Sequence, residues 1–151
     1  MEHRAALEAV QTFGKDDFER RAQTDEWSVK DIFCHLAFWN WEAVKSIEQV
    51  VRGERPVMML DVNFDEINRR EAATRRNLPL HKVMDDFRRS QQALVSLVAR
   101  MSESELTKET PHKSGDNKNA NAAWIVGGII EHYQEHYADL TGSVNKEQVN
   151  R

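Results

Sequence analysis

The stretch that decides the fold is Trp27-Ser-Val-Lys-Asp-Ile-Phe-Cys-His-Leu-Ala-Phe-Trp39. Ser28 is a favourable N-cap residue, and Asp31 follows three positions later, where a carboxylate meets the positive end of the helix dipole. The apolar residues of the stretch recur at helical spacing, so they form a face that packs against the rest of the protein. The stretch therefore predicts a long helix that begins at Ser28, continues to about Val51 and ends at Gly53.

Helical periodicity extends over the rest of the chain. No stretch combines the alternation of a β-strand with the turn residues of a hairpin, and no linker rich in Gly, Ser or Pro divides the 151 residues. We therefore expect a single all-α domain over residues 1–151. The expected helices cover residues 3–12, 28–51, 65–76, 79–101 and 120–142, with a connection at 53–62 and a polar, irregular segment at 102–120.

Composition and charge argue against two classes of partner. The chain carries 21 Lys and Arg against 25 Asp and Glu, a formal net charge of -4. It offers no basic field for a polyanion, so we expect no nucleic-acid partner. No apolar run approaches the roughly 20 residues that span a bilayer, and the amino terminus lacks a signal-peptide core. The single cysteine, Cys34, cannot form an internal disulfide, and these features together predict a cytoplasmic protein without a membrane partner.

Three histidines are candidate metal ligands. His132 and His136 are spaced i, i+4, which places both side chains on one face of a helix, with Cβ atoms roughly 5 to 6 Å apart. His35 lies on the apolar side of another helix and can supply the third ligand. Three neutral imidazoles leave a divalent ion its full charge and an open position, as in catalytic zinc sites. The alternative is a hydrogen-bonded core histidine at position 35 and a solvated pair on the last helix.

Residues in line with these histidines predict a pocket. Trp124 and Gly128 precede His132 and His136 at intervals of four, and Trp39 follows His35 at the same interval. If the two lines face each other, two tryptophans flank the ion and Gly128 leaves space on one approach to it. An apolar cavity with a few polar anchors is the usual form of a small-molecule site.

Carboxylates near the histidines are candidates to orient the ligands. Asp139 lies three residues after His136, and Asp31 lies four residues before His35. Glu131 and Glu135 each lie about 100° round the helix from the neighbouring histidine, so we assign neither as a general base. The catalytic residues therefore remain unassigned at this stage.

Three segments resemble the DinB-like superfamily. Residues 25–39 resemble the start of its second helix, where a Trp-Ser or Trp-Thr cap precedes a metal-binding histidine. Residues 129–137, Ile-Ile-Glu-His-Tyr-Gln-Glu-His-Tyr, resemble its fourth-helix motif. The middle of the chain, from Asn68 through Leu78-Pro-Leu to Phe87-Arg-Arg-Ser, is similar to the branch that includes the ClbS and DfsB proteins.

The resemblance implies a four-helix bundle in up-down-down-up order, often dimeric, with an extra short helix between the second and third bundle helices. It also implies one nickel or zinc ion held by His35, His132 and His136. Relatives are thiol-dependent transferases or isomerases, or a hydrolase that opens a cyclopropane in a genotoxin. We therefore expect a homodimeric, metal-dependent S-transferase or hydrolase that acts on a small electrophile, with a low-molecular-weight thiol as a candidate cosubstrate. The alternatives are a bundle that sequesters a small molecule around a structural metal, and a metal-free scaffold for another protein.

Overall fold

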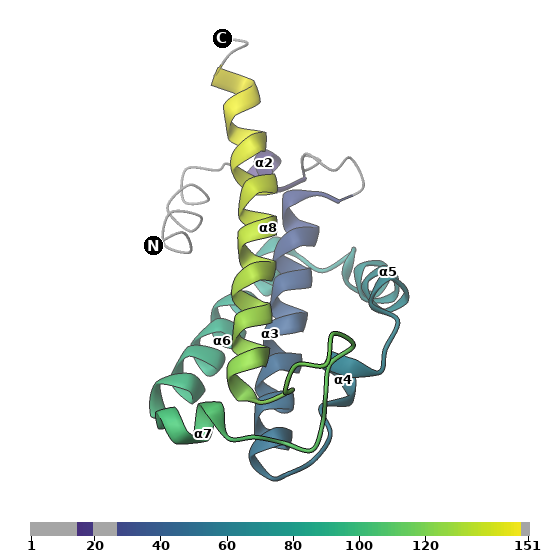
Figure 1. Ribbon diagram of the computed structural model, residues 1–151. Coiled ribbons are helices and arrows are strands. Elements are labelled where there is room, and N and C mark those ends of the chain that lie inside the picture. Colours follow the sequence, from purple (N-terminus) through teal and green to yellow (C-terminus); the bar gives the residue numbers. More distant parts are fainter. Residues whose placement is uncertain (1–14, 20–26, 149–151) are drawn as a thin grey trace.

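A computed structural model describes residues 15–19 and 27–148 (Figure 1). This part of the chain contains helices and no strand, as the sequence predicts. The helices are α2 (Lys15–Glu19), α3 (Val29–Val51), α4 (Val57–Leu60), α5 (Phe64–Arg75), α6 (Leu80–Arg100), α7 (Glu103–Thr107) and α8 (Ala122–Gln148). The helix expected at residues 3–12 lies outside the described residues. None of the described helices combines the length and apolarity needed to cross a bilayer.

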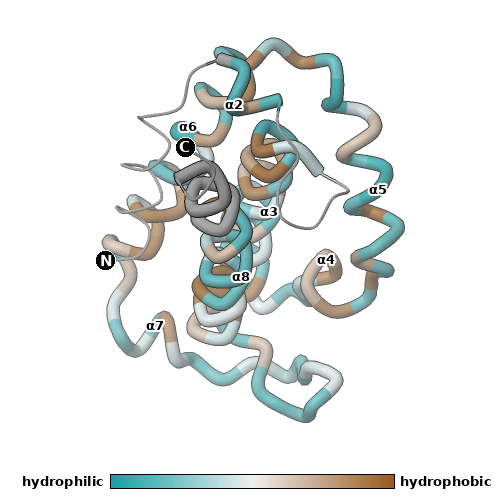
Figure 2. The backbone as a smooth tube through the Cα atoms, turned by 90° about the horizontal axis from the view of Figure 1, so that it is seen from above, coloured by the Kyte–Doolittle hydropathy of each residue, from teal (hydrophilic) through white to brown (hydrophobic). Residues whose placement is uncertain are grey.

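The three long helices lie side by side, with α3 in the middle of the molecule (Figures 1 and 2). Helices α3 and α6 run in the same direction, because Phe33 contacts Phe87 and the later Ile47 lines a cleft with Leu97. Helix α8 runs in the opposite direction (Figure 1). These directions match the last three helices of an up-down-down-up order, and the complete four-helix bundle stays a prediction.

Helix α3 begins and ends where the sequence predicts. Ser28 Oγ accepts a hydrogen bond of 3.1 Å from the backbone N–H of Asp31, and Asp31 Oδ2 accepts one of 3.0 Å from the backbone N–H of Ser28. This reciprocal pair is a capping box, which satisfies two backbone donors at the helix start. At the other end Gly53 adopts a φ of 81°, a left-handed conformation that glycine reaches without a Cβ penalty.

Helix α5 covers the side of α3 that faces away from α6. Trp39 Nε1 donates a hydrogen bond of 2.8 Å to Asn68 Oδ1, and Arg75 Nη1 donates one of 3.4 Å to the backbone carbonyl of Cys34. The guanidinium of Arg75 also lies 5.4 Å from the centre of the Phe38 ring. With neighbours on several sides, α3 is buried over most of its circumference and can position a side chain firmly.

Three short helices lie in segments that the sequence did not predict to be helical. The connection at 53–62 contains the single turn α4, and the segment expected to be irregular at 102–120 contains α7. Helix α7 has a capping box of its own between Ser102 and Glu105, which is a local signal in the sequence. Residues 15–19 form α2, and Phe18 packs there against Phe33.

The end of the last helix is also corrected. We expected it to end by Gly142, and it continues to Gln148. A glycine inside a helix costs roughly 1 kcal/mol relative to alanine, which is too little to end a helix when the following residues are compatible with one. No proline follows Gly142 to force a stop.

Candidate metal centre

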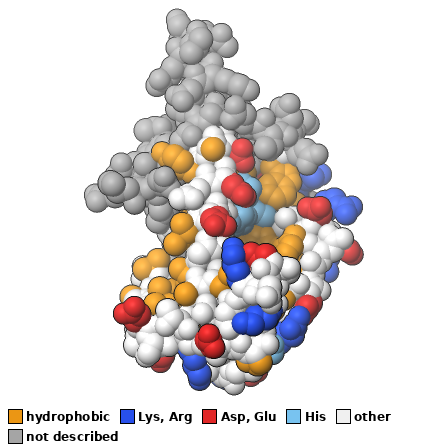
Figure 3. Space-filling view, viewed as in Figure 1, with side chains coloured by type: hydrophobic (Ala, Val, Ile, Leu, Met, Phe, Trp, Pro, Cys, Tyr) orange, Lys and Arg blue, Asp and Glu red, His pale blue; other side chains and the backbone are white. Residues whose placement is uncertain are grey.

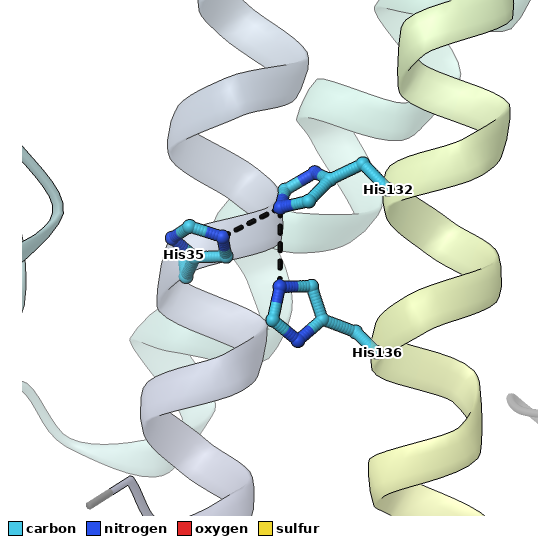
Figure 4. Close-up of side chains that lie close together, drawn as sticks. All are labelled: His35, His132 and His136. Carbon is cyan, nitrogen blue, oxygen red and sulfur yellow. Dashed lines mark hydrogen bonds between the residues drawn. The ribbon is translucent and has the colours of Figure 1, made fainter. Parts of the chain in front are cut away.

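Three histidine side chains converge between α3 and α8 (Figure 4). His35 projects from α3 and is 8% exposed, while His132 and His136 project from successive turns of α8. The Nε2 atoms of His35 and His132 are 2.6 Å apart, and those of His132 and His136 are 3.1 Å apart. One ligand atom from each residue lies within 4.8 Å of the other two. The structure thus brings together the three histidines that the sequence singles out.

Protons on the imidazole nitrogens cannot satisfy all the contacts in this cluster, which favours a bound cation. A nitrogen of a neutral imidazole either donates one hydrogen bond or accepts one. His132 Nε2 faces both other rings, so a single proton or lone pair on this atom cannot satisfy both contacts. A metal ion at the meeting point would accept all three lone pairs at once. Tetrahedral zinc with bonds of about 2.0 to 2.1 Å spaces its nitrogens about 3.3 Å apart, so small side-chain movements suffice.

Burial holds the three rings in the neutral form that binds metals. Burial, reinforced by the neighbouring imidazoles, lowers the pKa of His35 to about 2. It lowers the pKa of His132 to about 4 for the same reasons. Burial also lowers the pKa of His136, against the opposing effect of the Asp139 carboxylate. No proton therefore competes for these nitrogens at neutral pH.

Trp27 is an aromatic neighbour of the cluster that sequence reasoning did not assign to the site. The centre of its ring lies 4.6 Å from that of His35 at an interplanar angle of 56°. It lies 6.2 Å from that of His136 at 18°, which is close to parallel. Its contact with the last helix spans more than 100 residues and therefore leaves no local signal in the sequence.

The two tryptophans expected in the pocket pack against apolar and aromatic side chains of the core. Trp39 is buried and lies against Phe38 and Phe64. Trp124 is half-buried and packs against the same hydrophobic cluster. Among the ring contacts of the described residues, the histidines meet Trp27 rather than these two. A role for Trp39 and Trp124 in a pocket therefore stays a prediction.

The cluster has an open side at Gly128. This residue lies one turn before His132 and is exposed. A Cβ atom added there would meet no atom within 4 Å. In the space-filling view, histidine side chains reach the surface between acidic and hydrophobic ones (Figure 3). Part of the cluster is therefore at the surface, and no side chain at position 128 covers the neighbouring turn of α8.

The two aspartates have different surroundings. Asp139 Oδ2 lies 3.4 Å from His136 Nδ1, on the ring nitrogen that faces away from the other histidines. Asp31 is engaged in the helix cap through its carboxylate. Cys34 is buried, and burial together with the Asp31 charge raises the pKa of its thiol to about 11. A thiol with this pKa is a poor metal ligand at neutral pH, in agreement with its exclusion from the sequence-based set.

Comparison with known proteins identifies the family. The chain matches the family model of the DinB superfamily over residues 2–140. Because this match covers nearly the whole sequence, the chain belongs to the DinB superfamily. No curated protein and no solved structure shows significant similarity to it.

Proposed function

We propose that the protein is a metal-dependent enzyme, a thiol-dependent S-transferase or a hydrolase, which acts on a small electrophilic compound. The observation that supports this most directly is the convergence of three imidazoles, His35, His132 and His136, beside the open side at Gly128. Three neutral ligands leave a coordination position free, whereas structural zinc sites have four protein ligands.

Each residue has a defined part in this proposal. The three Nε2 atoms would hold one nickel or zinc ion, which would supply Lewis-acid chemistry for activating a water or a thiol. Asp139 lies beside His136 Nδ1 and keeps the proton on that atom, so that Nε2 stays free to bind. Trp27 lies against two of the rings and excludes water from that side.

Three finer assignments belong to the same proposal. The resemblance in the middle of the chain supports the ClbS and DfsB branch, and the directions of the long helices support an up-down-down-up bundle. Two large apolar side chains, Val95 on α6 and Ile130 on α8, are 55% and 53% exposed. The homodimer rests on the resemblance to a family whose members are often dimeric, and these two side chains are candidate contacts of its interface.

Metal content and turnover test the proposal. We expect about one equivalent of nickel or zinc in protein purified without chelators or metal columns, and none in His132→Ala. His81→Ala is the matched control, because His81 is an exposed histidine in the first turn of α6. Full metal retention by His132→Ala would contradict the site.

The second step is a screen of small electrophiles, such as epoxides and activated aryl halides, with and without a low-molecular-weight thiol. We expect product to exceed one equivalent of protein in the wild type and in His81→Ala, and to be absent with His132→Ala. Uptake that stops at one equivalent without product would instead favour the sequestering bundle with a structural metal.

A further inference from the structure

Trp27 lies in an unusual position for a residue that only precedes a helix. It is half-buried and comes directly before the N-cap Ser28. A hydrophobic residue at this position commonly packs against the first turn of its own helix. The Trp27 ring instead meets His35, two turns into α3, and His136 on α8. It therefore joins two ligands that come from different helices.

The helix cap fixes the origin of this side chain. The reciprocal hydrogen bonds between Ser28 and Asp31 hold the backbone directly after Trp27. The two rings also contact His132, and His136 Nδ1 lies beside the Asp139 carboxylate. The Trp27 ring is tilted against His35 and nearly parallel to His136 at a longer centre-to-centre distance. In this position it restricts the rotation of both imidazoles about their Cβ–Cγ bonds.

The chemistry of the contact depends on the metal. An imidazole that binds a dication loses electron density from its ring, and an indole has the most electron-rich face among protein side chains. The contact between Trp27 and each ring therefore becomes more favourable when the ring binds an ion. The face of a phenylalanine ring is less electron-rich than that of an indole, and an aliphatic side chain has no π-face.

We infer that Trp27 is a positioning residue of the metal centre, one that aligns His35 and His136 for a shared ion and strengthens its binding. This inference rests on the proposed function for the existence of the ion. Residues that orient metal ligands typically contribute 10- to 100-fold to metal affinity. An indole in contact with two ligand rings should also report metal binding by its fluorescence.

The test is a titration of metal-stripped protein with Co(II) or Ni(II), by tryptophan fluorescence and by competition with a chromophoric chelator. We expect Trp27→Leu to bind about 10- to 100-fold more weakly, and Trp27→Phe to fall between it and the wild type. The matched control is Trp41→Phe, because Trp41 Nε1 donates its hydrogen bond to Asp86 on α6. Quenching by the metal should fall strongly in Trp27→Phe and little in Trp41→Phe.

The outcomes separate this inference from the proposed function. Wild-type affinity in Trp27→Leu, with the wild-type protein binding one equivalent, would overturn the positioning role and leave the metal centre intact. A wild-type protein that takes up no metal would overturn both. Should Trp27→Leu fail to fold by circular dichroism, Trp27→Phe decides, and wild-type affinity with undiminished quenching in that variant would overturn the inference.

Discussion

Asn40 Nδ2 donates a hydrogen bond of 2.8 Å to the hydroxyl of Tyr133, the residue that follows the candidate metal ligand His132. The same amide donates to Ser90 Oγ at 3.2 Å, and both Asn40 and Ser90 are almost fully buried. Three helices therefore meet at one buried amide. Helices slide past one another more easily along apolar contacts than along hydrogen bonds with fixed partners. This contact therefore fixes the axial position of α8 relative to α3.

Tyr133→Phe should weaken both the fold and the metal centre. The change removes the hydroxyl but keeps the ring, so Asn40 is left with an unsatisfied buried group, at a cost of about 1 to 3 kcal/mol. We expect urea unfolding to show this loss of stability. We also expect metal affinity to fall, because the axial position of His132 and His136 relative to α3 is no longer fixed. Ser90→Ala is the control: it disturbs the same amide without touching α8, so it should lower stability and leave metal affinity near the wild type. Equal metal affinity in both variants would contradict this role of Tyr133.

The buried histidines should make the metal-free protein sensitive to acid. The folded-state pKa of His35 is lowered to about 2 and that of His132 to about 4, both from 6.5. The unfolded chain therefore binds more protons than the folded chain below pH 6.5, and stability is lost as the pH falls. Each buried histidine contributes a slope of up to about 1.4 kcal/mol per pH unit.

Urea unfolding of metal-stripped protein between pH 7.5 and pH 5 measures this effect. We expect the free energy of unfolding to be nearly constant above pH 6.5 and to decrease below it. His35→Gln removes one of the titrating groups. The free energy of unfolding of this variant should therefore decrease less steeply with falling pH, by the slope that corresponds to about one proton. A variant with the same slope as the wild type would show that His35 is not held neutral by the fold.

The parts of the fold that sequence alone predicts are those with local causes. The start of α3 follows from Ser28 and Asp31, and its end from Gly53, because the residues that form each cap lie within a few positions of one another. The histidine pair on α8 is equally local. The end of α8 was mispredicted because a glycine in a helix is a small local cost that the rest of the helix can outweigh.

The parts that sequence did not predict depend on contacts between distant segments. No local feature of the sequence predicts that Trp27 contacts two candidate metal ligands, because the contact with His136 forms only when α8 packs against α3. Trp39 gives a second example, because its hydrogen bond to Asn68 on α5 has no local signal in the sequence. Helical spacing predicts which side of a helix faces inward, but not which neighbour it meets.

The cap of α3 should matter more for metal binding than its distance from the histidines suggests. Ser28→Ala removes the side-chain acceptor for the backbone N–H of Asp31 and should cost about 1 kcal/mol. Because this cap also holds the backbone beside Trp27, we expect metal affinity to fall as well. Ser102→Ala is the matched control, since Ser102 caps the short, exposed α7 in the same way. It should lower stability by less and leave metal affinity unchanged.

Substitutions of Gly128 should change the access of ligands to the metal centre without causing loss of the metal. The residue is exposed and a Cβ there meets no atom within 4 Å, so packing does not require a glycine. Gly128→Ala should therefore raise the free energy of unfolding by up to about 1 kcal/mol through helix propensity, and retain the metal. Gly128→Phe should also retain one equivalent of metal by elemental analysis, because its side chain projects from the open side rather than into the ligands.

The two Gly128 variants should differ in the size of the ligand that can bind to the ion. A phenyl ring at position 128 lies one turn from His132 and obstructs the open side, whereas a methyl group occupies little of it. Binding of a bulky ligand such as 4-phenylimidazole to the Co(II) form, followed by its visible spectrum, should be weakened strongly in Gly128→Phe and slightly in Gly128→Ala. Azide is small enough to reach the ion in both. If 4-phenylimidazole bound Gly128→Phe as tightly as the wild type, ligands would have to approach from another direction.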